Sequence, residues 1–260
     1  MTALAIRHQR SEGSILLSMG AEGPKRLRES HAAKLRIPVR SREAILINTG
    51  GGLAGGDRFF YDISAEDDAR LTVTGQAAER VYRTLGPAAE VEVRLTAGDR
   101  ATLMWLPQET ILFDGAALTR GINADLGGGA RFLAVESVLL GRVAMGEAVA
   151  AAHFRDRWRV RQKGKLIHAD DIAFDGAPPS SAATLGPARA FATVVLIAED
   201  AEDRLDRVRA VLAPTDAASA WNGKLVARLV AGDGFDLRKS LIPALTVLAG
   251  PASLPKTWSF

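Results

Sequence analysis

The sequence has no cysteine and only four histidines and two tyrosines in its 260 residues. The absence of cysteine excludes disulfide bonds, thiolate metal sites and cysteine nucleophiles. No apolar run is long enough to cross a membrane, and residues 1–14 lack the apolar core of a signal peptide. The formal net charge is only +3, and basic residues are spread along the chain, unlike those of a nucleic-acid-binding arm. We therefore expect a cytoplasmic protein that binds neither nucleic acid nor membrane.

Short alternating runs dominate the first two-thirds of the chain. Val91, Val93 and Leu95 alternate with polar residues, which predicts a strand with one buried face. Residues 97–99 have the composition of a turn, and the run 101–106 after them is apolar. We predict that the two runs form a hairpin.

Two later segments are also predicted to be strands. Trp158 and Val160 alternate with arginines, and a turn at 163–165 separates this run from the next, which predicts a second hairpin. The run 190–198 is apolar on both faces, as is typical of a central strand.

The helical signals lie in the last third of the sequence. Residues 199–214 have apolar residues at helical spacing, acidic residues first and a proline at the end. A second helix is predicted from Phe235 to Leu248, with Pro243 inside it as the site of a kink or a later start. No linker is evident, so we expect a single domain over residues 1–260, with a long loop at 178–187.

The most unusual stretch is INTGGGLAGGDRFFYDI at 47–63, in which five of the seven residues from Gly50 to Gly56 are glycine. Gly50, Gly52 and Gly55 satisfy G-x-G-x-x-G, but a dinucleotide site needs a helix after the glycines. The residues that follow predict a strand, and Asp57 stands where a phosphate-binding loop needs lysine. We therefore interpret the glycines as a tight bend between strands.

Four further blocks carry a resemblance to a known family. They read TGQAAERVYR at 74–83, WLPQETILFDGA at 105–116, ARFLAVESVLLGRVAMGE at 130–147, and the closing LPKTWSF. Together with the glycine stretch, these blocks resemble the urease accessory protein D (UreD, or UreH) family. The similarity spans nearly the whole chain, and its strongest motifs lie between about residues 48 and 147.

The resemblance implies a fold and a function. The family fold is mainly β, with many short strands in stacked, partly helical (β-helix-like) layers and two α-helices in the C-terminal third. Proteins of this family are not thought to be enzymes. They bind the urease apoprotein and, with the F-type and GTPase urease accessory proteins, assist nickel insertion. The resemblance implies no tightly bound cofactor and only transient nickel.

The nickel-binding candidates are carboxylates, because no cysteine is present and the four histidines lack ligand spacing. Acids within the family-like motifs that could line a water-filled nickel passage are Asp57, Glu109, Glu136 and Glu147. Glu109 and Glu136 lie between apolar residues, so the alternative is that they form buried ion pairs. The available partners are Arg80, Arg131 and Arg142.

Two arginines in the same motifs are candidates for contact with another protein. Arg83 and Arg142 fit this role because arginine is enriched at interface cores. The alternative is a salt bridge to Glu79 or Glu147. Apart from the resemblance, the composition also fits a β-rich enzyme or carbohydrate-binding module with an acid-lined cleft.

Overall fold

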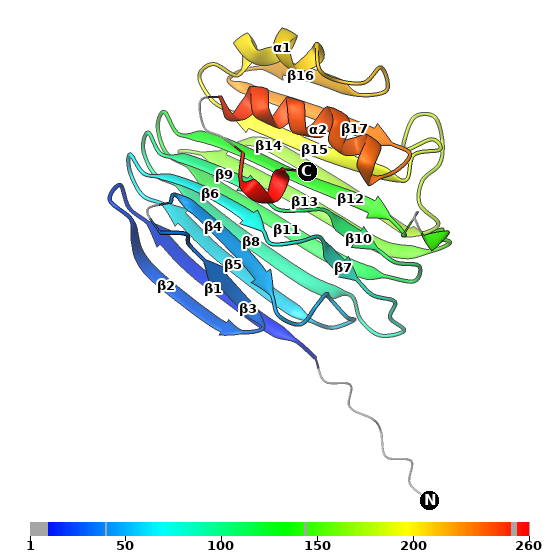
Figure 1. Ribbon diagram of the computed structural model, residues 1–260. Helices are drawn as coiled ribbons and strands as arrows, with labels where there is room; N and C mark the ends of the chain where they lie inside the picture. The colour runs from blue at the N-terminus through cyan, green and yellow to red at the C-terminus, as the bar shows by residue number, and fades with distance from the viewer. Residues whose placement is uncertain (1–9, 40, 143–144, 251–253, 260) are drawn as a thin grey trace, which may run out of the picture.

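The computed structural model describes residues 10–39, 41–142, 145–250 and 254–259, and two β-sheets account for most of them (Figure 1). Sheet A contains, in spatial order, β14 (Lys165–Gly176), β13 (Ala152–Gln162), β11 (Ala117–Leu126), β8 (Ala89–Ala97), β5 (Arg58–Ala65), β1 (Glu12–Met19) and β2 (Pro24–His31). Sheet B contains β16 (Ala217–Trp221), β17 (Lys224–Ala231), β15 (Ala190–Ile197), β12 (Arg131–Leu140), β9 (Thr102–Leu106), β6 (Arg70–Gly75), β4 (Glu43–Asn48) and β3 (Ala33–Arg36). The short strands β10 (Thr110–Leu112) and β7 (Glu79–Val81) extend sheet B beside β12.

The chain winds between the two sheets as a solenoid. From β4 to β13 it passes back and forth between sheet B and sheet A, and neighbouring strands within each sheet are parallel. Each turn of the winding places one strand in sheet A and, in sheet B, either one strand or two short ones in succession (β6 and β7, β9 and β10). The expectation of a mainly β fold in stacked, partly helical layers is confirmed.

The predicted hairpin between residues 91–97 and 101–106 is wrong. β8 lies in sheet A between β5 and β11, whereas β9 lies in sheet B between β6 and β12. Alternation identifies a buried face but does not identify the neighbouring strand, and here each neighbour is parallel and comes from another turn of the winding. The hairpin across residues 163–165 is confirmed as the antiparallel pair β13–β14.

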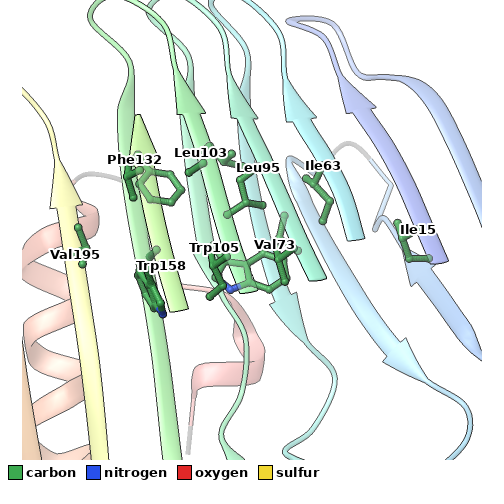
Figure 2. Close-up of a cluster of buried hydrophobic side chains, with 14 of the residues drawn as sticks. Ile15, Ile63, Val73, Leu95, Leu103, Trp105, Phe132, Trp158 and Val195 are labelled. Atoms are coloured by element: carbon green, nitrogen blue, oxygen red, sulfur yellow. The ribbon is translucent and has the colours of Figure 1, made fainter. Parts of the chain in front are cut away.

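The main core lies between the two sheets. Figure 2 shows rows of apolar side chains in this space, from Ile15 and Ile63 at one end to Trp158 and Val195 at the other. On β9, Leu103 and Trp105 enter this core, while the alternate residues face the opposite side of sheet B. Burial of these rows on both sheets supplies most of the apolar stabilisation.

A second core covers the outer face of sheet B. Helix α2 (Gly234–Ala249) packs there against β12, β15 and β17, beside the short α1 (Leu205–Arg209), as seen in Figure 1. β15 is buried on both faces because it lies between the two cores, which confirms the prediction of a central strand.

The two predicted helices are present, with different accuracy. Helix α2 matches the predicted range within one residue at each end and contains Pro243, and Asp233 caps its start through the Asp236 N–H at 2.8 Å. The first helix is much shorter than predicted, with a 3₁₀ turn (Glu202–Arg204) followed by α1. None of the helices in the described residues is apolar over a length that would cross a bilayer.

Candidate functional site

Sheet B is interrupted where it faces the glycine stretch. β12 is continuous and pairs first with β9 and then with β10, but Pro107, Gln108 and Glu109 separate those two strands. Residues 76–78 separate β6 from β7 in the same way. Pro107 has no N–H to donate to a ladder, and a methyl group on Gly75 would lie 3.2 Å from the Gln108 nitrogen. The two irregular segments therefore lie against each other and open the sheet.

A cavity of about 230 Å³ extends from this opening into the space between the sheets. Its outer part is formed by the opened segments and the glycine stretch, and its inner end reaches buried charged groups. The polar and charged residues that line it include Asn48, Glu79, Gln108, Arg120 and Glu136, and Gly52 lines its outer part.

The inner end of the cavity reaches a buried group of three charged residues, of which Arg120 and Glu136 line the cavity. Arg120 lies between Glu136 and Asp156, with N···O distances of 2.6 and 2.7 Å, and each of the three residues is no more than 6% exposed. Arg120 also donates to the Thr110 hydroxyl at 3.0 Å, and the Trp105 indole N–H donates to Glu136 at 2.8 Å. Two carboxylates thus share one guanidinium and leave one negative charge in the core when both are ionised.

Burial raises the pKa of Glu136, and the charge of Asp156 raises it further, while Arg120 and the Trp105 N–H oppose the shift. Glu136 therefore holds its proton to a higher pH than an exposed glutamate does. Such a group binds a cation in competition with protons.

The outer part of the cavity contains a second carboxyl group, that of Glu79. Asn48 donates to both Glu79 oxygens at 3.2 Å and to the Gly52 carbonyl at 3.1 Å, which ties the start of β7 to the glycine stretch. Burial raises the pKa of Glu79 to about 7, with a further contribution from Asp57 and opposing hydrogen bonds from Asn48 and the backbone. The cavity therefore has a carboxyl of raised pKa at each end.

Replacing Glu79 with glutamine is expected to remove a loss of stability at alkaline pH. The folded-state pKa of about 7 exceeds the ordinary 4.5, so the contribution of Glu79 is fully present below pH 4.5 and is lost as pH rises through 7. At pH 8 the Glu79→Gln variant should therefore gain up to about 3 kcal/mol in unfolding free energy over the wild type. Urea unfolding at pH 5 and pH 8 measures this gain.

The exposed Glu22 provides the control for this prediction. The Glu22→Gln variant should follow the wild type at both pH values. A Glu79→Gln variant whose difference from the wild type is the same at pH 5 and pH 8 would contradict the assignment.

The glycine stretch forms a bend between β4 and β5, as predicted. Gly52 has φ +146°, and a methyl group there would lie 2.4 Å from the Tyr82 ring and 2.8 Å from the Arg80 carbonyl. Asp57 is buried in this bend, and its two oxygens accept the backbone N–H groups of Ser11 at 2.7 Å and Ala54 at 2.8 Å. Asp57 thus fixes the bend and lies near Glu79 without lining the cavity.

Glu109 is buried beside the opening and faces helix α2. Arg238 donates to its two oxygens at 2.6 and 3.0 Å and to the Gln108 side-chain oxygen at 2.5 Å. The alternative considered from the sequence, that Glu109 and Glu136 form buried ion pairs, is present in the structure, but the partners named from the sequence are wrong. Arg238 and Arg120 take these places because strand pairing and the docking of α2 determine which arginine reaches each acid.

Glu147 and the two predicted interface arginines lie on the loops that connect sheet B to sheet A. Arg142 donates to Glu147 at 2.8 Å and covers the Phe113 ring at 4.5 Å, so the salt bridge considered as an alternative is present. Arg83 is exposed and pairs through its backbone with Ala116. A role of Arg83 and Arg142 in contact with another protein stays a prediction.

The structure does not bring the four nickel candidates together. Only Glu136 lines the cavity, and the described residues contain no group of three His, Asp or Glu side chains able to hold a metal ion. The sequence interpretation missed Glu79 as a site residue, and it missed Arg120 and Asp156. Arg120 and Asp156 could have been recognised from the sequence, because each interrupts a row of apolar residues on the inward face of its strand.

Comparison with known proteins extends over the whole chain. The model of a family described as UreD urease accessory protein matches residues 2–259. A Rhizobium etli protein named urease accessory protein UreD is 48% identical over 270 aligned residues, which cover 100% of this chain and 99% of the relative. Proteins of the same name from Mesorhizobium japonicum and Agrobacterium fabrum are 45% and 44% identical, over 96% and 98% of this chain and 95% and 93% of their own. The similarity therefore includes both sheets, the cavity and α2.

Proposed function

Because the chain belongs to the UreD family of urease accessory proteins, and so has a role in urease maturation, we propose that it acts as a non-catalytic scaffold through which nickel passes. In this proposal it binds the urease apoprotein together with the F-type and GTPase accessory proteins. Nickel is the cargo of the protein and not a resident cofactor.

The observation that carries the proposal is the cavity with a carboxyl group at each end. Ni²⁺ is a borderline ion that accepts oxygen ligands, and Glu79 and Glu136 supply carboxylate oxygens at the two ends of the cavity. A site with three strong ligands would retain the ion, whereas separated single carboxylates bind it weakly and release it. The separation of the two carboxyl groups therefore suits the transfer of a nickel ion better than its storage.

The raised pKa values of the two carboxyls suit the same role. When no ion is present, a proton on Glu79 avoids the cost of a buried charge, and a proton on Glu136 removes the excess negative charge that Glu136 and Asp156 leave on the single Arg120. The arriving cation displaces the proton, and the proton returns after the cation leaves. The cavity then avoids an uncompensated buried negative charge both with and without a bound nickel ion.

The test is nickel delivery by the double variant Glu79→Gln and Glu136→Gln. The full chain is co-expressed with the urease subunits and the other accessory proteins, and the nickel content of purified urease is measured. We expect a several-fold lower nickel content, with unchanged co-purification of the accessory proteins with urease. The Glu22→Gln variant, which alters an exposed glutamate, should load urease normally.

Normal nickel content with the double variant would overturn the passage. Glutamine keeps the size of the side chain and one of its two acceptor oxygens at each position. A thermal unfolding scan of each purified complex therefore separates a blocked passage from a failure to fold.

A further inference from the structure

The outer face of sheet A carries a groove along β11 that is separate from the cavity between the sheets. The outward residues of β11 include Thr119 and Gly121, which are small and lie level with longer side chains on both neighbours. Gly121 pairs with Glu92 of β8 on one side and with Arg157 of β13 on the other. The groove has a volume of about 550 Å³. The strand register therefore builds a channel with one wall from β8 and one from β13.

Most of the charges that border this groove are paired. On the β8 side, Arg58 lies 3.4 Å from Glu90 and Arg94 lies 2.9 Å from Glu92. On the β13 side, Arg155 donates to both oxygens of Asp171, at 3.1 and 2.7 Å. Each of these pairs is neutral as a unit.

Arg157 is the exception. It is exposed, lines the groove at its middle, and has no hydrogen bond or ion pair within the part of the chain that the structure describes. Its cross-strand neighbour is Asp171, but that carboxylate is held by Arg155. The groove thus has one uncompensated positive charge, directly across from the glycine that leaves the floor open.

We propose that this groove is a docking site for an extended segment of a protein partner that presents a carboxylate side chain to Arg157. The inference rests on the proposed function, because the partner is sought among the proteins of urease maturation. A carboxylate over Gly121 would form an ion pair with Arg157, and the segment around it would lie between the two walls. The paired acids of the β8 wall disfavour a nucleic-acid backbone, and a second copy packed face to face would bring two Arg157 side chains together.

Gly121 allows a test that blocks the groove without disturbing the fold. A methyl group at this position has no atom within 4 Å, and its φ is not in the left-handed region. A tryptophan there should fill the groove and raise local strand propensity. The Gly121→Trp variant should therefore keep the unfolding temperature of the wild type or exceed it.

The experiment co-expresses the full chain with the urease subunits and with the F-type accessory protein, and quantifies what co-purifies. We expect Gly121→Trp and Arg157→Glu to lower recovery of one of these two partners by about tenfold or more. The matched controls are Gly121→Ala, which leaves the groove open, and Arg26→Glu, which reverses an exposed charge on the distant edge strand β2. Both controls should bind as the wild type does.

Retention of both partners by Gly121→Trp and Arg157→Glu would overturn the docking site. If Gly121→Trp lowers partner recovery but Arg157→Glu does not, the partner binds in the groove without an ion pair to Arg157. That result would also overturn the proposal of a carboxylate on the partner. Binding of a soluble oligosaccharide by the chain, abolished by Gly121→Trp, would assign the groove to another ligand. Partner recovery tests the docking site, whereas the nickel content of urease, measured in variants that still assemble, tests the nickel passage. The two proposals can therefore fail separately.

Discussion

Replacing Arg120 with methionine is expected to lower the free energy of unfolding by about 3–5 kcal/mol. The substitution leaves the Glu136 and Asp156 carboxyls facing each other in the core without a cation, and both residues are less than 5% exposed. The two groups must then remain protonated, or the region must open to water. Urea unfolding at pH 7, followed by circular dichroism, measures the loss.

Two further variants define what this loss means. Arg58→Met removes an arginine of the exposed outer face, where ion pairs contribute about 1 kcal/mol or less, so it should be nearly neutral. Combining Arg120→Met with Glu136→Gln and Asp156→Asn removes the uncompensated charges and should recover part of the stability. An Arg120→Met variant as stable as Arg58→Met would contradict a buried ionic group at this place.

Replacing Trp258 with alanine is expected to cost about 3–5 kcal/mol, because a large side chain leaves a packed site. Trp258 is 1% exposed in the second core, donates its indole N–H to the Leu106 carbonyl at 3.0 Å, and lies under the Arg238 guanidinium at 5.4 Å. The substitution therefore creates a cavity and removes a hydrogen bond beside the opening in sheet B. Thermal and urea unfolding of the purified chain measure the effect.

Trp221 is the matched control for this prediction. It is 43% exposed at the edge of sheet B and contacts Lys224 through its ring at 4.5 Å. Trp221→Ala should cost less than about 1 kcal/mol, because little apolar surface returns to water. Equal losses from the two substitutions would mean that the C-terminal segment does not pack on β9 in solution.

The sequence predicted the strands well because burial leaves a local pattern. Residues 190–198 are apolar on both sides, and β15 lies between two cores. The glycine bend was also predictable, because strands were evident before and after it. The strands and the glycine bend depend on residues close together in the sequence, so a local pattern is enough to predict them.

The winding and the cavity could not be predicted from such patterns. Trp105 pairs with Val73 on one side and with Ala134 on the other, at separations of 32 and 29 residues. The turns of the winding differ in length, so no fixed repeat is visible. The partner of Glu109 is 129 residues away on α2, and only the tertiary fold brings the two together. Inward-facing charges in apolar rows, as at Arg120, were the available signal for the buried ionic group.

The parallel winding also determines how the chain can fold. Each strand within it must find a neighbour about thirty residues away, so no hairpin forms the middle of either sheet early. Folds dominated by such distant pairings form slowly, over milliseconds to seconds. Until the next turn is added, the last strand has an open edge that can pair with another chain. At one permanent edge of sheet A, β2 exposes Lys25, Arg26 and Arg28, and this charge opposes intermolecular pairing once folding is complete. Each interior strand is such an open edge only until the next turn covers it, so the chain is most prone to aggregate while it folds.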